Sequence, residues 1–327
     1  MQINRRNFIQ KAGIYAATPL LISELLACTG KGNSETTDST AIKSVVEKAG
    51  LETFGIQLWT VKEEIAKDPK GTLKALASYG YKQIESCDTG KGIFWGMSAV
   101  DFKSYLDEIG LTIVSSHCNP DFTVKKEKED EFKKLASDAA SIGMKYLINP
   151  FPGENLKTSD DYKIVAEGLN RQGEICKANG IKMAYHNHHM EFLPLADKGI
   201  GEQILLNGTN ADLVDFELDL YWNIKAGQTP NDWFTKYPNR FKLVHVKDLY
   251  PADKMAEIET NEKVEGFWPV GGSTELGKGK IDFPKILSEA KAAGVEYFVV
   301  EQERFDGSTP LDSAKLDADY MKAFRFA

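Results

Sequence analysis

The residues best suited to chemistry lie in one stretch, Ile181 to Phe192, which reads I-K-M-A-Y-H-N-H-H-M-E-F and holds three of the five histidines in the 327-residue chain. Side chains two residues apart in a β-strand share a face. If this stretch begins as a strand, His186 and His188 therefore point to the same side. Two such imidazoles suit metal binding or proton transfer, but a polar strand end with solvated histidines explains a lone His-x-His pair equally well.

The elements that position these residues follow a repeating pattern. Short runs rich in β-branched and aromatic residues alternate with segments whose apolar residues have helical spacing, and glycines such as Gly80, Gly110 and Gly180 end several of the helical segments. We expect strands at 53–60, 81–87, 111–118, 146–151, 181–188, 212–219, 241–248 and 297–303. We expect helices at 70–79, 98–109, 129–142, 159–179, 199–207, 231–237, 283–293 and 311–324, and a Gly-rich loop at 249–280.

Eight alternating strands and helices over about 270 residues predict an α/β protein with a single (β/α)₈ TIM barrel, which we place at residues 51–327. The structural alternative is a doubly wound open sheet. No Gly-x-Gly-x-x-Gly motif follows the first strand, so the sequence offers nothing for a nucleotide-binding version of that fold.

The N-terminus has the pattern of a lipoprotein signal peptide, residues 1–28. Arg5 and Arg6 supply a charged start, residues 12–22 are apolar, and Leu-Leu-Ala-Cys ending at Cys28 has the form of a lipoprotein cleavage site. Residues 29–50 are a linker and lead-in whose first part is rich in Gly, Ser, Thr and Asp. We therefore expect an exported protein, periplasmic or membrane-anchored, that contacts the membrane only through lipid on Cys28.

Composition narrows the class of partner. The net charge is −8, and the densest group of basic residues is the mixed run from Lys125 to Lys134. Proteins that bind nucleic acid normally present a basic patch, so we expect no nucleic-acid partner. A small molecule is the expected partner, and a homo-oligomer is compatible with the sequence. The cysteines other than Cys28 have no disulfide or metal-type spacing.

Polar residues gather at the predicted strand ends, where TIM barrels place their chemistry. They are His117, His186, His188, Glu217, Asp219, His245, Lys247, Glu301 and Glu303. Imidazoles and carboxylates around one axis form a mixed ligand set that suits Mn²⁺, Co²⁺ or Zn²⁺, whereas Mg²⁺ prefers more oxygen. Asp219 and Glu301 would repel each other without a cation between them. We expect one divalent metal ion, Mn, Co, Zn or Mg.

Three tryptophans lie near strand ends and are candidates for an apolar wall against which a sugar ring stacks. They are Trp59, Trp222 and Trp268. Large aromatic residues of barrels are more commonly part of the buried core, so both interpretations stay open.

Six motifs in residues 53–325 together resemble the xylose-isomerase-like barrels, a family that includes sugar isomerases and epimerases, inosose-processing enzymes, 3-keto-glycoside lyase/hydratase relatives and endonuclease IV. The motifs are F-G-I-Q-L-W, S-S-H-C, Y-H-N-H-x-x-E-F, D-x-Y-W, V-H-V-K-D and V-E-Q-E. The resemblance implies Asp219, His245 and Glu301 as metal ligands. The family's usual acid at strand five is absent; His186 stands in the nearest place, with His188 as the alternative.

Further roles are expected around the metal, because a carboxylate next to a metal can still take a proton from a substrate carbon that the metal acidifies. Glu301 is expected to act as the base, with His188 or Glu191 as the partner acid. Glu191 resembles a substrate-facing acid of the epimerases, although a loop carboxylate would look the same. Lys247 is expected to assist catalysis, and His117 and Gln57 to contact the substrate.

Enzymes of this kind remove a proton next to a carbonyl and leave an enediolate. Export and the absence of an Arg cluster favour an unphosphorylated sugar. We predict a lyase or hydratase that acts on a 3-keto-sugar or 3-keto-glycoside in glycoside breakdown, with a sugar isomerase or epimerase as the alternative. A rival from another class is a non-catalytic sugar-binding lipoprotein, which would need the aromatic wall but no metal.

Overall fold

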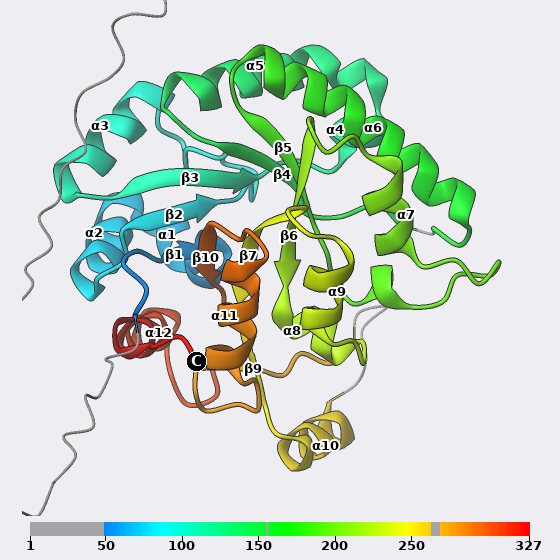
Figure 1. Cartoon of the computed structure of the whole chain (residues 1–327). Coiled ribbons are helices and arrows are strands. Elements are labelled where there is room, and N and C mark those ends of the chain that lie inside the picture. The colour runs from blue at the N-terminus through cyan, green and yellow to red at the C-terminus, as the bar shows by residue number, and fades with distance from the viewer. Residues whose placement is uncertain (1–48, 155, 263–268) are drawn as a thin grey trace, which may run out of the picture. The chain divides into compact units, whose positions relative to one another are not determined.

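The computed structural model describes residues 49–154, 156–262 and 269–327, so the predicted signal peptide with Cys28, most of the predicted linker and Trp268 lie outside the described residues. Eight parallel strands form a closed barrel in the order β1-β10-β7-β6-β5-β4-β3-β2 (Figure 1). They are β1 Gly55–Gln57, β2 Gln83–Ser86, β3 Thr112–His117, β4 Tyr146–Asn149, β5 Lys182–His186, β6 Val214–Asp219, β7 Phe241–Val246 and β10 Tyr297–Val300. Pairing of β1 with β10 closes the sheet, so the predicted TIM barrel is confirmed and the open sheet is excluded.

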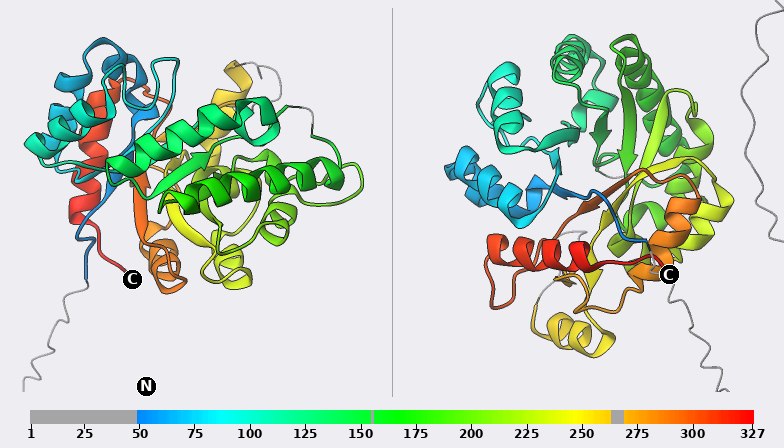
Figure 2. Two further views of the ribbon diagram at one scale, coloured as in Figure 1. Left: turned by 90° about the horizontal axis from the view of Figure 1, so that it is seen from above. Right: turned by 60° about the vertical axis from the view of Figure 1, so that its left-hand side comes forward.

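Helices surround the strands on the outside of the barrel (Figure 2). They are α1 Lys62–Lys67, α2 Pro69–Tyr79, α3 Ala99–Ile109, α4 Asp121–Val124, α5 Glu129–Ser141, α6 Ser159–Ala178, α7 Gly201–Gly208, α8 Leu220–Lys225, α9 Pro230–Lys236, α10 Ala252–Asn261, α11 Phe283–Ala292 and α12 Pro310–Ala323. The last helix, α12, packs against α2, so the two ends of the barrel sequence lie side by side. Within the described residues, no helix is long and apolar enough to cross a membrane.

The interior of the barrel changes from apolar to polar along the strands. Tyr146, Ile148, Ala184 and Leu243 form a buried cluster inside the sheet. Because side chains alternate, the residue two positions after Ala184, which is His186, points inward as well. The same parity directs the strand-end residues of β6, β7 and β10 into the barrel.

The loop predicted at 249–280 contains structure that the sequence pattern did not indicate. Helix α10 lies within it, and β8 Asp248–Leu249 pairs with β9 Ser273–Thr274 in an antiparallel ladder. The helix buries only Met255 and Ile258, so its apolar pattern is weak. The Asp248 carboxylate organises the rest of the segment by accepting backbone N–H groups at 2.8 to 3.2 Å from Leu249, Gly277, Gly279 and Ile281.

One buried carboxylate behind this segment gives the fold a pH-sensitive point. Asp317 on α12 is 1% exposed, and its Oδ1 accepts the backbone N–H of Leu276 at 2.8 Å. Burial, together with the nearby carboxylates Glu275 and Asp248, raises the pKa of Asp317 to about 8 against the opposing effect of the hydrogen bond. The side chain is therefore protonated in the folded protein at neutral pH.

This protonation predicts how stability depends on pH. An aspartate in the unfolded chain has a pKa of about 4, so the folded state holds the proton more tightly, and stability falls as pH rises from about 4 to about 8. Asp317→Asn keeps an oxygen for Leu276 and removes this dependence, which amounts to at most about 1.4 kcal/mol per pH unit. Urea denaturation at pH 5 and pH 8 measures the free energy of unfolding. Relative to the parent, this free energy should be higher for the variant at pH 8 than at pH 5. Asp319→Asn on the exposed side of α12 is the control, and identical pH dependence of Asp317→Asn and the parent would contradict the assignment.

Candidate active site

A cavity of about 700 Å³ opens among the predicted site residues. Its lining comes from the segments that follow β1, β2, β3 and β4 and from the ends of β5, β6 and β10, so it lies at the C-terminal end of the barrel. The lining residues are Trp59, Cys87, Asp88, Gly90, His117, Cys118, Asn119, Pro120, Pro150, Phe151, His186, His188, Trp222, Glu301 and Glu303. Trp59 and Trp222 thus contribute to the wall of the cavity, as the apolar-wall interpretation requires.

Asp219, His245 and Glu301 form one cluster, in which one ligand atom from each residue lies within 4.8 Å of the others. His245 Nδ1 is 3.2 Å from Glu301 Oε2 and 3.7 Å from Asp219 Oδ2. The three residues come from the neighbouring strands β6 and β7 and from the residue after β10. Register explains the approach, since Asp219 pairs with His245 and His245 pairs with Val299, two residues before Glu301.

The hydrogen bonding of the Asp219 carboxylate indicates whether a cation fits between these three residues. Its Oδ1 accepts the backbone N–H of Trp222 at 2.7 Å, which caps α8 and fixes the side chain. Its Oδ2 is buried, and no hydrogen-bond partner for it occurs in the part of the chain that the structure describes. A buried carboxylate oxygen without a donor is costly unless a cation faces it. The donor set of one imidazole and two carboxylates therefore fits a divalent metal.

Lys247 provides a fixed positive charge beside this cluster. The side chain is fully buried, Nζ lies 3.1 Å from Glu301 Oε2, and it also contacts the Glu303 carboxylate. Burial alone would lower the pKa of Lys247, but the carboxylates of Glu301 and Glu303 raise it. Burial would raise the pKa of Glu301, but Lys247 and His245 hold it well below its ordinary value. Glu301 is consequently ionised, and Lys247 acts as a cation rather than as a base.

A second cluster lies beside the first and shares His245 with it. The atoms His117 Nε2, His186 Nδ1 and His245 Nε2 lie 3.2, 3.1 and 3.2 Å from Glu217 Oε2. His186 belongs to this group, and not to the one with Asp219 and Glu301. Burial, with the neighbouring His245 and His117, keeps the pKa of His186 well below its ordinary value, so this imidazole is neutral.

Glu85 on β2 is a part of the site that the sequence patterns did not indicate. The side chain is completely buried, and its Oε1 lies 2.8 Å from His245 Nε2 and 3.0 Å from His117 Nε2. Burial alone would lower the pKa of His117, but Glu85 and Glu217 raise it to about 9. His117 is therefore a cationic imidazole on the cavity wall. Glu85 could have been suspected from the sequence, because a charged residue inside a buried strand is unusual.

Three of the residues expected to touch substrate or take part in catalysis lie elsewhere in the site. Gln57, Glu191 and Lys247 do not line the cavity. Gln57 donates to Glu85 Oε1 at 2.7 Å. Glu191 accepts hydrogen bonds from the Tyr185 hydroxyl at 2.6 Å and from the backbone N–H of His188 at 2.9 Å. Its carboxylate therefore stabilises the C-terminal end of β5 and does not face the cavity.

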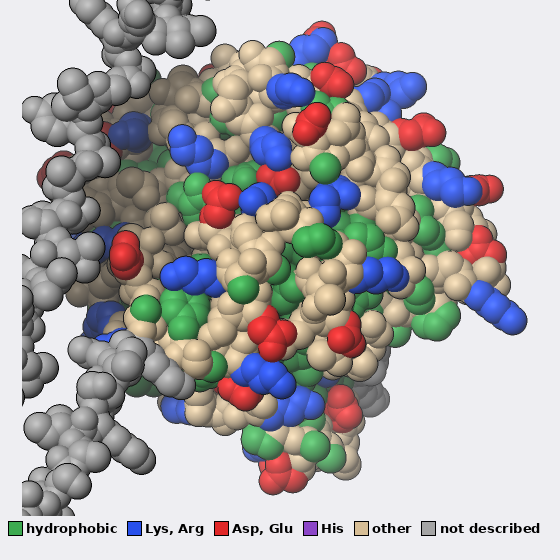
Figure 3. Space-filling model, viewed as in Figure 1, with side chains coloured by type: hydrophobic (Ala, Val, Ile, Leu, Met, Phe, Trp, Pro, Cys, Tyr) green, Lys and Arg blue, Asp and Glu red, His purple; other side chains and the backbone are tan. Residues whose placement is uncertain are grey.

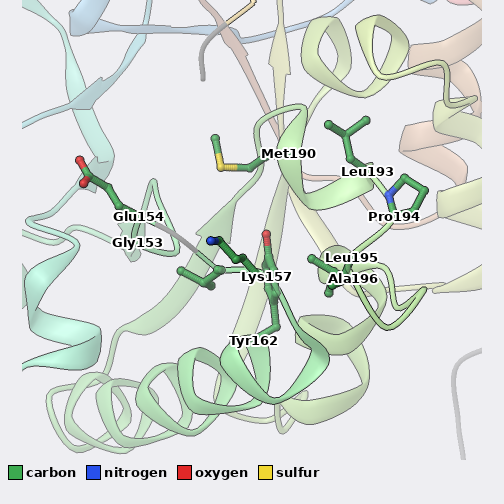
Figure 4. Close-up of a pocket in the computed structure, with 10 residues that line it drawn as sticks. Gly153, Glu154, Lys157, Tyr162, Met190, Leu193, Pro194, Leu195 and Ala196 are labelled. Carbon is green, nitrogen blue, oxygen red and sulfur yellow. The ribbon is translucent and has the colours of Figure 1, made fainter. Parts of the chain in front are cut away.

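A separate cavity of about 420 Å³ lies between α6 and the segments that follow β4 and β5 (Figure 4). Tyr162 projects from α6 toward Met190, and residues 193–196 form another wall. None of the predicted site residues lines this mostly apolar cavity. On the face shown in Figure 3, Lys and Arg side chains are intermixed with Asp and Glu, a pattern unlike the basic patch of a nucleic-acid-binding surface.

Comparison with known proteins gives a consistent family. A family model described as a xylose isomerase-like TIM barrel matches residues 73–324. An inosose dehydratase of Clostridium perfringens is 32% identical over 178 residues, which cover 53% of this chain and 58% of that protein. An inosose dehydratase of Clostridium botulinum is 27% identical over 242 residues, with 67% of this chain and 79% of that protein covered. The chain thus spans about three-fifths to four-fifths of these relatives' length.

Solved structures share the fold. A sugar phosphate isomerase/epimerase from Parabacteroides distasonis has a TM-score of 0.67 and 29% identity, with 87% of this chain and 97% of that chain covered. The IolI protein, solved with a bound zinc atom, has a TM-score of 0.64 and 18% identity, with 83% of this chain and 96% of that chain covered. At that identity the likeness to IolI concerns the fold alone.

Removal of either central ligand is expected to abolish metal binding while the barrel stays folded. Asp219→Asn puts an amide N–H₂ or a neutral oxygen where the charged Oδ2 lies, and His245→Ala removes the nitrogen between the two carboxylates. Metal content by mass spectrometry, with circular dichroism for folding, measures both effects. Asp88→Asn, a carboxylate on the same cavity outside the cluster, is the control and should keep its metal. Stoichiometric metal in both ligand variants would contradict this site.

Proposed function

Because the chain belongs to the xylose isomerase-like TIM barrel family, we propose that it is a divalent-metal-dependent enzyme that removes a proton next to a carbonyl of a sugar. The observation that carries the proposal is the buried cluster of Asp219, His245 and Glu301, of which Glu301 also lines the 700 Å³ cavity. We place the metal on these three residues, because His186, the expected strand-five ligand, faces Glu217 instead. A bound cation would polarise the carbonyl and acidify the neighbouring C–H.

An unphosphorylated sugar suits the cavity. Among the described residues that line it, none is Lys or Arg, the side chains that most often hold a phosphate ester. Trp59 and Trp222 offer flat apolar surfaces for a sugar ring, and Asn119 and Asp88 offer hydrogen-bonding groups for its hydroxyls. The wall composition therefore favours a polar, ring-shaped and uncharged substrate.

Proton transfer falls to two side chains on the cavity wall. Glu301 is ionised and reaches the cavity, so it is the base that takes the proton from carbon. His117 holds a proton at neutral pH and also faces the cavity, so it is the better acid toward a substrate oxygen. His188 and Glu191 were the two expected acids. Burial and the charge of Lys247 lower the pKa of His188, so it is a neutral imidazole, and Glu191 does not line the cavity. Lys247 holds Glu301 in place and balances its charge.

The reaction that we favour is elimination of a group β to the carbonyl of a 3-keto-sugar or 3-keto-glycoside, or the reverse hydration. Two curated relatives are named inosose dehydratases, and loss of water β to a carbonyl begins with the same proton removal. A sugar isomerase or epimerase is the second candidate, supported by the 29% identical isomerase/epimerase structure. Incubation of metal-loaded protein with 3-keto-glucosides and with free sugars in D₂O, followed by NMR, separates an unsaturated or hydrated product from an epimer.

Glu301→Gln tests the base. The amide keeps an oxygen for the metal and removes the basic site, so kcat should fall by about 10² to 10⁴. Deuterium incorporation at the carbon next to the carbonyl should disappear together with turnover. Glu303→Gln, a neighbouring carboxylate that also contacts Lys247, is the control and should exchange at close to the parent rate. Deuterium exchange at the parent rate in Glu301→Gln would show that this carboxylate is only a ligand.

We also propose that the enzyme works as an exported lipoprotein, on the strength of the cleavage-site pattern that ends at Cys28. Cys28→Ala in the full chain should yield soluble, active protein, because the substitution removes the thiol that carries the lipid. Fractionation of cells followed by metal and activity assays measures this. Variant protein that stays with the membrane fraction would contradict the lipid anchor.

A further inference from the structure

A smaller cavity of about 190 Å³ adjoins the 700 Å³ cavity of the candidate active site. Asp88, Cys118 and Asn119 line both cavities, so the two meet at the segments that follow β2 and β3. The 420 Å³ cavity, by contrast, has no described lining residue in common with the active-site cavity. The 190 Å³ space between these two segments and α5, which we call the side cavity, is therefore an extension of the place where the proposed reaction occurs.

Hydrogen bonds to the backbone fix the boundary between the two cavities. Asp88 Oδ1 accepts the backbone N–H groups of Gly90 and Gly92 at 2.8 and 3.0 Å. Asn119 Oδ1 accepts the backbone N–H of Asp121 at 2.9 Å. Asp88 Oδ2 and Asn119 Nδ2 make no hydrogen bond within the described residues. One fixed acceptor and one fixed donor are thus available to sugar hydroxyls at the junction of the cavities.

The wall of the side cavity combines apolar surface with negative charge. Phe122 and Leu135 are only partly buried, so each presents apolar surface to the cavity. Three carboxylates and one ammonium group give the lining a formal net charge of −2, which disfavours a phosphate, a sulfate or a uronate. The same carboxylates can accept hydrogen bonds from hydroxyls. The charged lining residues are Asp88, Glu131, Lys134 and Asp138.

The position of the side cavity suits the group that departs in the proposed elimination. His117, the proposed acid, is the last residue of β3 and directly precedes Cys118 and Asn119, which line both cavities. A substituent on the departing oxygen can therefore extend into the side cavity while the reacting ring stays in the larger one. Glu131 and Lys134 on α5 are exposed, so the outer end of the side cavity reaches the surface.

We propose that the side cavity binds the leaving group of a glycoside substrate, and that this group is a neutral second sugar residue. The substrate is then a 3-keto-disaccharide or a longer 3-keto-oligosaccharide, and not a free 3-keto-sugar. The proposal deepens the proposed function and rests on it for the bond that breaks.

Leu135→Trp fills the side cavity from α5 and tests the proposal by comparing two leaving groups. In the metal-loaded parent, kcat/KM should be about 10-fold higher for the 3-keto derivatives of cellobiose and maltose than for those of the methyl glucosides of the same anomer. The reason is that binding energy from the remote sugar is used at the reacting carbon. In the variant this ratio should fall about 10-fold. A ratio near one in the parent, or the parent's ratio in a folded variant, would overturn the proposal.

Leu195→Trp is the matched control. Leu195 is also a partly buried leucine, but it lines the 420 Å³ cavity. This variant should keep the parent's ratio, and circular dichroism verifies that both variants fold. A ratio lowered by Leu195→Trp and not by Leu135→Trp would mean that the second sugar lies in the other cavity, which contradicts the proposal.

Glu131→Lys gives a second test that does not depend on how well Leu135→Trp folds, because Glu131 is exposed. The substitution changes the formal charge of the lining from −2 to zero. Relative to a glucosyl leaving group, kcat/KM for a glucuronosyl leaving group should rise about 2- to 5-fold, the size of an exposed charge interaction. An unchanged preference would count against a leaving group held beside α5.

Binding of unreactive sugars separates this proposal from the proposed function. Calorimetric titration of the parent should show cellobiose or maltose binding about 10-fold more tightly than the corresponding methyl glucoside, and Leu135→Trp should lose the difference. That pattern without turnover of any 3-keto-sugar would contradict the proposed function and support the sugar-binding side cavity. Equal affinities, or tighter binding of phenyl glucoside than of the disaccharides, would overturn the proposal of a second sugar.

Discussion

Burial of negative charge at one end of the barrel is the constraint that the rest of the site satisfies. Glu85, Glu217, Asp219 and Glu301 are each at most 6% exposed. Taking a carboxylate out of water costs several kcal/mol unless cations or donors replace the lost hydration. Lys247 and the imidazoles of three strands supply much of this compensation. Gln57 and Ser115 donate to Glu85, and the backbone N–H of Trp222 donates to Asp219. The proposed divalent cation beside Asp219 would complete this balance.

Strand pairing is what brings these charges together. Asp219 and His245 are register partners on β6 and β7, and His186 and Glu217 are register partners on β5 and β6. His245 joins the two clusters because an imidazole has two nitrogens on opposite edges, each of which faces a different carboxylate group. The functional geometry is therefore a property of the sheet, which is the rigid part of the molecule, and less of the loops that surround the cavity.

The sequence predicted the strands and the direction of their side chains, but not the depth at which the side chains meet. Parity placed Asp219, His245 and Glu301 on one wall, and the structure brings them together. The same parity gave no sign that Glu85 on β2 meets His245 on β7, because the distance between strands that are not neighbours is set by the closed sheet. Glu191 was not predictable for a different reason. Tyr185 points out of the barrel, as alternation requires, and its hydroxyl donates a hydrogen bond to the Glu191 carboxylate on the outer side of β5.

His117, which lines the cavity together with Glu301, bears on the choice between elimination and isomerisation. An isomerase returns the abstracted proton to a neighbouring carbon, so one carboxylate can serve both half-reactions. An elimination also needs a proton for the departing oxygen, and a base that has just accepted one is poorly placed to give it at the same moment. His117 lies on the same cavity as Glu301, and Glu85 and Glu217 keep it protonated at neutral pH. A separate acid beside the proposed base is what departure of a β-hydroxyl or glycosidic oxygen requires, and this supports our proposal of a lyase or hydratase over the isomerase.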